Sequence, residues 1–89
     1  MRCRLRIKGR VQGIGYRYFT VETAKKFGLT GWVRNCSNGD VECEIQGDEK
    51  LLKEFSSRLE SGHLWARVDG IEKQELVEKT DEKGFHITD

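Results

Sequence analysis

The sequence predicts an α+β domain in which two helices cover one face of a mostly antiparallel sheet. Three observations predict this class. Apolar and polar residues alternate at the start of the chain, two later segments have helical spacing, and an Asn-Gly pair lies between two further alternating segments. A chain of 89 residues supports one core, so we expect a single domain over residues 1–89.

The first predicted strand covers residues 2–8. Three apolar side chains alternate there with four cations, which is typical of a strand with one buried face and one wet face. After a glycine-rich run, residues 16–28 have apolar side chains at helical spacing and end in Gly28. They predict the first helix, because glycine is the usual residue just past a helix C-terminus.

Residues 29–35 and 40–46 flank Asn38-Gly39 and therefore predict a hairpin. The second helix is predicted over residues 48–62, with Asp48 as its N-cap and a buried stripe of leucine and phenylalanine.

The last part of the chain alternates less regularly. The segment from Val68 to Val77 and the short segment FHIT (residues 85–88) predict a closing strand or a hairpin. Together with the earlier elements they predict a two-layer sandwich of the split βαβ, ferredoxin-like, type.

Charge is balanced in total and uneven along the chain. The net charge is +1, but residues 1–20 contain six cations and no acid, whereas residues 69–89 contain seven acids. If the first and third strands are neighbours, the arginine row lies opposite a glutamate row, and cross-strand ion pairs explain most of the basicity. A sheet face that binds anions is the alternative. The balanced total argues against a general polyanion binder.

The sequence shows no apolar run of membrane-spanning length and no signal-peptide core. Its three cysteines lack metal-binding spacing, and their odd number argues against a disulfide framework. We therefore expect a reduced cytoplasmic protein without membrane contacts and without a zinc site, and we expect it to be a monomer. Cys3 and Cys43 share the buried face of neighbouring strands in this prediction, and we expect them to pack as free thiols.

The stretch GRVQGIGYR, Gly9–Arg17, joins the first strand to the first helix. Glycine-rich junctions of this kind can bind phosphate, because backbone N–H groups and the helix dipole converge there. The stretch lacks the Gly-Lys-Ser/Thr ending of a Walker loop, and Tyr18 replaces the third glycine of a dinucleotide fingerprint. From the residues alone, two interpretations stay open: an oxyanion cradle ending in Arg17, and a flexible loop whose arginine pairs with an acid.

GRVQGIGYR and TGWVRNCSNGDVE (residues 30–42) closely resemble two motifs of the acylphosphatase family. A weaker resemblance, in GHLWARVDGI and GFHITD, extends to the last strand. The family fold is the sandwich predicted above. The resemblance implies hydrolysis of acyl phosphates, which are carboxyl-phosphate mixed anhydrides, to a carboxylate and inorganic phosphate without metal or cofactor.

The resemblance also implies roles for individual residues. Arg17 grips the phosphoryl oxygens, and Asn35 holds the attacking water. The implied phosphate cradle consists of Gly9, Arg10, Val11, Gln12, Gly13, Ile14 and Gly15. These roles suit the chemistry, because an acyl phosphate has a good leaving group and needs mainly charge stabilisation and an aligned water. His63 and His86 lie outside both motifs, and we expect them at the surface.

Two other function classes fit this fold. An RNA-recognition module needs aromatic side chains on the open sheet face, where the first and third strands carry cations and glutamates instead. A domain that only binds a phosphorylated metabolite would use Arg17 in the same way, but it has no need of Asn35 as a water holder. We expect a small-molecule acyl phosphate as substrate, inorganic phosphate as product, and no nucleic-acid partner.

Overall fold

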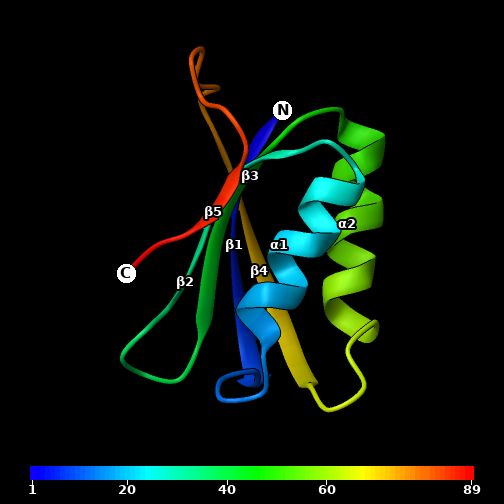
Figure 1. The fold of residues 1–89 in the computed structure, drawn as a ribbon, viewed down its shortest axis with the longest axis vertical. Helices are drawn as coiled ribbons and strands as arrows, with labels where there is room; N and C mark the ends of the chain where they lie inside the picture. Colours follow the sequence, from blue (N-terminus) through cyan, green and yellow to red (C-terminus); the bar gives the residue numbers. More distant parts are fainter.

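In the computed structural model, which describes all 89 residues, two helices lie on one face of a five-stranded sheet (Figure 1). The elements are β1 (Arg2–Arg10), α1 (Tyr16–Lys26), β2 (Thr30–Asn35), β3 (Val41–Gln46), α2 (Glu49–Ser61), β4 (Arg67–Leu76) and β5 (Phe85–Ile87). The strands lie in the order β4-β1-β3-β2-β5. The predicted split βαβ sandwich is confirmed.

Most of the sheet is antiparallel. β1 pairs with β3 and β4, and β3 pairs with β2, all in antiparallel fashion, whereas β5 runs parallel to β2. Arg4 lies directly opposite Glu44 on β3. Arg6 lies directly opposite Glu42. The first and third strands are therefore neighbours, and the arginine and glutamate rows face each other as predicted.

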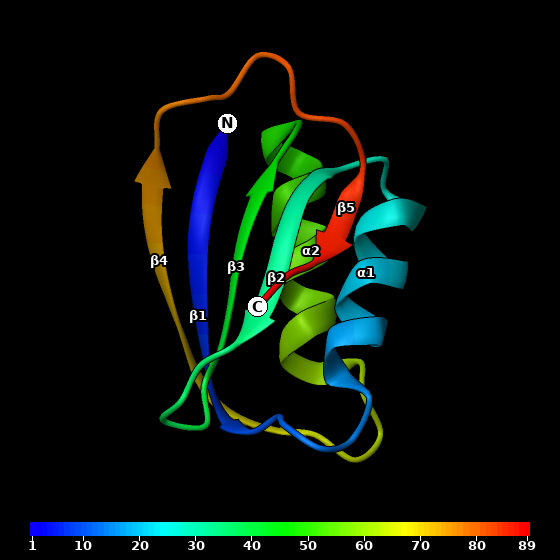
Figure 2. The same cartoon turned by 60° about the vertical axis from the view of Figure 1, so that its left-hand side comes forward.

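The closing segments do not form a hairpin, so that alternative was wrong. β4 pairs with β1 at one edge of the sheet and β5 pairs with β2 at the other. The connection between them, residues 77–84, crosses the end of the sheet (Figure 2). Gln46 holds it there, because its side-chain amide donates to the Lys79 carbonyl at 2.8 Å and accepts from the Lys79 N–H at 2.9 Å. A short parallel edge strand has no local turn signal to reveal its partner.

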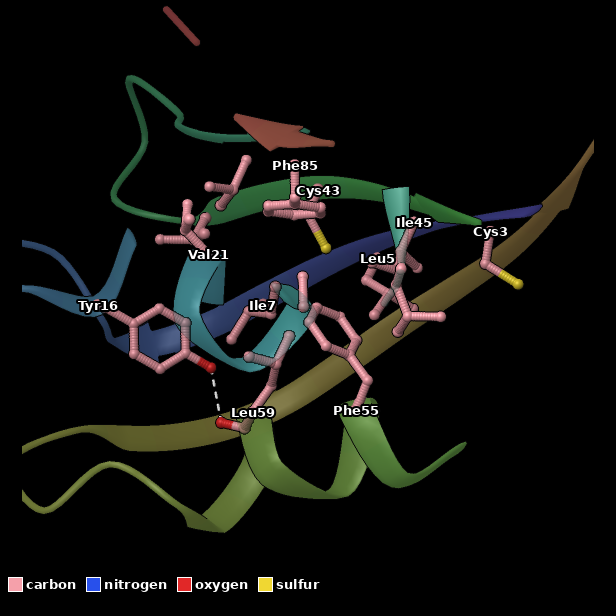
Figure 3. Close-up of a cluster of buried hydrophobic side chains, with 14 of the residues drawn as sticks. Cys3, Leu5, Ile7, Tyr16, Val21, Cys43, Ile45, Phe55, Leu59 and Phe85 are labelled. Atoms are coloured by element: carbon pink, nitrogen blue, oxygen red, sulfur yellow. Dashed lines mark hydrogen bonds between the residues drawn. The ribbon is translucent and has the colours of Figure 1, made fainter. Parts of the chain in front are cut away.

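The core lies between the sheet and the two helices (Figure 3). Alternate residues of β1 and β3 face Phe55 and Leu59 of α2. Asp48 caps α2, since its carboxylate accepts from the Lys50 N–H at 2.9 Å. The Tyr16 hydroxyl donates to the Leu59 carbonyl at 2.6 Å and so joins the start of α1 to α2.

The cysteines are free, as expected. Cys3 and Cys43 are buried in the core, and burial raises the pKa of both thiols, so they pack as small apolar groups. No helix is both long and apolar enough to cross a membrane.

Candidate active site

The junction between β1 and α1 contains two glycines with left-handed backbone conformation. Gly13 has φ +78° and Gly15 has φ +77°, and a Cβ at either position would meet open space. Conformation, not crowding, therefore favours glycine at both. Gly15 is the N-cap of α1, and no side chain caps the helix. The N–H groups of the first turn, at Tyr16, Arg17 and Tyr18, are available to an anion.

Gly9 is required for a different reason. It lies within β1 with φ +133°, and a Cβ there would overlap the carbonyl oxygen of Arg67 on β4. Gly9 and Arg10 are strand residues that pair with β4. The cradle that the resemblance implies thus begins with two strand residues and continues into the loop 11–15.

A small open cavity of about 120 Å³ lies where this loop meets the end of β2. Its lining residues are Val11, Gly13, Gly15, Tyr16, Arg17, Tyr18 and Asn35. Arg17 and Asn35, which come from different elements, therefore share one cavity with both left-handed glycines. Gly9, Arg10, Gln12 and Ile14 do not line it.

Arg17 is an arginine without a partner. Its guanidinium has no carboxylate within 4.0 Å and makes no hydrogen bond to the protein. The alternative left open by the sequence, a loop arginine that pairs with an acid, does not occur. The five donors of this guanidinium are free to bind a planar or tetrahedral oxyanion.

Asn35 is the last residue of β2, and its side chain reaches the cavity. Its Oδ1 atom is buried, and no group of the protein donates a hydrogen bond to it. Such an unpaired acceptor costs about 1–3 kcal/mol unless water or a ligand satisfies it. The turn-stabilising bond that Asn35 could have made belongs to Asn38, whose Oδ1 accepts from the Asp40 N–H at 3.1 Å.

Gln12 connects the loop to the β2–β3 hairpin. Its Nε2 atom donates to the carbonyls of Cys36 and Asp40, each at 2.8 Å. These two residues close the hairpin, because the Cys36 N–H donates to the Asp40 carbonyl at 2.8 Å. The side chain of Gln12 therefore binds the hairpin, which sequence reasoning did not foresee.

Tyr16 and Tyr18 line the cavity and were absent from the predicted site. Tyr16 is buried, and burial raises the pKa of its hydroxyl. Tyr18 is 71% exposed at the mouth. Both flank Arg17 in the first helical turn, and this adjacency was the signal that could have found them. Neither histidine lines the cavity. His86 is exposed, as expected, whereas His63 is half-buried against the rings of Tyr16 and Phe19.

The open face of the sheet carries ion pairs. The Nη2 atom of Arg4 lies 3.3 Å from Oε2 of Glu44, and the Nη2 atom of Arg6 lies 3.2 Å from Oε2 of Glu42. Burial opposes ionisation of Glu42, but hydrogen bonds from Arg34 and Arg6 outweigh it and lower the pKa of this carboxyl. The cationic first strand is thus neutralised by its neighbours, and the interpretation as cross-strand ion pairs is confirmed.

Comparisons with known proteins agree on one family. The family model described as Acylphosphatase matches residues 3–87. The acylphosphatase of Geobacillus kaustophilus (strain HTA426) is 43% identical over 81 residues, which cover 91% of this chain and 86% of that protein. The acylphosphatase of Clostridium beijerinckii (strain ATCC 51743 / NCIMB 8052) is 44% identical over 81 residues, covering 91% and 90%. The crystal structure of acylphosphatase from Bacillus subtilis matches with a TM-score of 0.92 at 34% identity, covering 98% of this chain and 97% of that one.

Proposed function

The chain belongs to the acylphosphatase family and hydrolyses acyl phosphates, and we propose that Arg17 and Asn35 carry out this reaction. One observation supports the assignment above all others. A guanidinium without a carboxylate partner and a buried amide oxygen without a donor line the same cavity. Unsatisfied polar groups that converge on one cavity are what a reactive site requires and what a folded core avoids.

The phosphoryl group binds at the start of α1. Backbone N–H groups of residues 11–18 and the positive end of the helix dipole face its oxygens, and Arg17 adds a two-pronged contact. The guanidinium stays charged at every working pH. Gly9 and Arg10 act indirectly in this proposal, because their pairing with β4 fixes where the loop begins.

Asn35 holds the attacking water through Oδ1, in line with the bond to the acyl oxygen. The water oxygen forms a bond to phosphorus as the bond between phosphorus and the acyl oxygen breaks. The carboxylate leaves with that electron pair, and the two protons of the water end on the phosphate. Because a carboxylate is a good leaving group, the site needs no general acid.

The proposal includes a small-molecule acyl phosphate as substrate, inorganic phosphate as product, and no metal or cofactor. It also includes a monomer in the cytoplasm, in keeping with the three free cysteines. A domain that only binds a phosphorylated metabolite is the second candidate. It accounts for Arg17 but gives the unpaired Oδ1 of Asn35 no purpose.

The test is phosphate release from acetyl phosphate in excess EDTA. We expect turnover undiminished by the chelator and competitive inhibition by inorganic phosphate. Turnover that disappears with EDTA and returns with a divalent cation contradicts the metal-free reaction. Binding of acetyl phosphate without phosphate release supports the second candidate instead.

A further inference from the structure

Gln12 is the side chain that links the loop before α1 to the β2–β3 hairpin. Both N–H groups of its amide are used, one toward the Cys36 carbonyl and one toward the Asp40 carbonyl, each at 2.8 Å. The same two carbonyls accept backbone hydrogen bonds within the hairpin, from the N–H groups of Gly39 at 3.2 Å and Cys36 at 2.8 Å. The Gln12 amide thus lies where the hairpin loop begins and ends, next to the residue that follows Asn35 in the sequence.

The neighbours of Gln12 explain why this link matters. Val11 is 1% exposed and packs in the core, so the backbone directly before Gln12 is held in place. Beyond it, Gly13 and Gly15 have left-handed backbone, and Gly13 has no atom near the position of a Cβ. No other side-chain hydrogen bond joins residues 11–17 to residues 35–41.

We propose that Gln12 is a positioning residue that sets the distance between the phosphate-binding loop and Asn35, and so aligns the attacking water with the phosphoryl group. The proposal rests on the proposed roles of Arg17 and Asn35. The side chain of Gln12 touches neither substrate nor water, and it acts through the backbone carbonyls of Cys36 and Asp40. In-line attack is sensitive to such placement, since a displacement of about 1 Å can cost on the order of 100-fold in rate.

Two substitutions separate this role from direct phosphate binding. Gln12→Ala removes both hydrogen bonds and keeps every backbone N–H of the loop. We expect kcat to fall about 10- to 100-fold while the inhibition constant of phosphate and KM change little. Gln12→Glu keeps the size of the side chain but turns a carboxylate toward two carbonyl oxygens. We therefore expect its kcat to be as low as that of Gln12→Ala.

Gln46 provides a matched control at the other end of β3. Its side-chain amide also makes two hydrogen bonds to backbone, with the Lys79 carbonyl at 2.8 Å and the Lys79 N–H at 2.9 Å. Because Gln46 also accepts a hydrogen bond from Arg2 at 3.2 Å, Gln46→Ala should lower Tm at least as much as Gln12→Ala. It should leave kcat at the wild-type value when all proteins are assayed well below their Tm.

A double-mutant cycle on kcat is the deciding kinetic experiment. If Gln12 acts through Asn35, then Gln12→Ala lowers kcat in the wild-type background but adds little in the Asn35→Ala background. Independent, multiplying losses overturn the proposal. A wild-type kcat in folded Gln12→Ala also overturns it, and a weakened phosphate inhibition constant would make Gln12 a ligand-binding residue.

Amide hydrogen exchange tests the link itself without relying on activity. We expect the Cys36 and Gly39 amides to exchange faster in Gln12→Ala, with core amides unchanged. Unchanged exchange at both amides overturns the proposal. If exchange rises while Asn35→Ala keeps full kcat, the role of Asn35 fails, and with it the route by which Gln12 acts, although the link between loop and hairpin stands.

Discussion

Arg2 and Arg17 are the same residue type near opposite ends of β1, and their surroundings differ. The Arg2 side chain is 1% exposed. Its guanidinium donates hydrogen bonds to Glu44, Gln46 and Glu82. Arg17, by contrast, has no carboxylate within 4.0 Å and opens onto the cavity that contains Asn35.

The difference in surroundings indicates that the charge of Arg2 stabilises the fold, whereas the charge of Arg17 is available to a ligand. The hydrogen bond with Glu82 is the largest of the effects that raise the pKa of Arg2, and the same contact lowers the pKa of Glu82. Every donor used in that network is withdrawn from any ligand. At the other end, an unpaired guanidinium and an unpaired amide oxygen leave hydrogen bonds to be made by a substrate and a water.

Removing Arg17 should have the largest effect. Arg17→Ala takes away the contact made to the phosphoryl group in both the bound substrate and the transition state. We expect kcat/KM to fall by at least about 10³-fold, together with loss of phosphate binding. Arg17→Lys should recover little, because a point charge does not reproduce a two-pronged contact.

The control for this variant is Arg58→Ala on α2, which removes another arginine that has no ion pair. Steady-state kinetics on acetyl phosphate should show wild-type turnover for it. A comparable loss of activity in Arg58→Ala would show that the loss in Arg17→Ala is not specific to the cavity.

Removing Arg2 should act on stability and not on catalysis. Arg2→Ala leaves Glu44 and Glu82 partly buried without their main cation, which costs about 3–5 kcal/mol in the free energy of unfolding. Urea denaturation measures this loss, and activity per folded molecule should stay at the wild-type value. A reduced kcat in the folded variant would place the reaction on the open face of the sheet.

Acid should weaken the contact between Arg2 and Glu82. The pKa of Glu82 lies below its ordinary value of 4.5 because Arg2 donates to the carboxylate. The unfolded chain therefore binds this proton more tightly than the folded protein. The stabilisation is present above about pH 4.5 and is lost as pH falls through the lower folded pKa. Urea midpoints measured against pH should show this decline, and Glu82→Gln should make it shallower.

Arg4→Ala should have the smallest effect. The Arg4 side chain is 42% exposed, and Glu44, its partner at 3.3 Å, keeps the ion pair with Arg2. We expect a change of at most about 1 kcal/mol in unfolding free energy and nearly unchanged kinetics. A substantial loss of kcat would indicate an anion-binding role for the sheet face, which is the alternative that the sequence left open.

The elements that local patterns specify were predictable from the sequence. Alternation in β1, the Asp48 cap of α2 and the Asn38-Gly39 turn each depend on neighbouring residues, and each is observed. Arg2 is the exception in β1, because its partners Glu44 and Glu82 bury it on the face predicted to be wet. The partner of β5 depends on a contact with β2 that is distant in sequence, so no local signal marks it.

The site divides in the same way. Arg17 and Asn35 were named through the family resemblance, whereas the reason for Gly9 and the side-chain contacts of Gln12 depend on tertiary packing. Gly9 is needed because β4 passes against it, and Gln12 reaches carbonyls more than twenty residues away along the chain. The resemblance named Gly9 and Arg10 as part of the cradle, but it did not show that both are strand residues.

In the proposed mechanism Arg17 binds the phosphoryl group and Asn35 holds the water. Calorimetric titration of Asn35→Ala with phosphate, beside its steady-state kinetics, tests it most directly. We predict a near wild-type Kd for phosphate and a kcat lower by about 10²–10³-fold, the usual loss for one well-placed polar group. If folded Asn35→Ala fails to bind phosphate, Asn35 is a phosphate ligand and the assignment of the water is wrong.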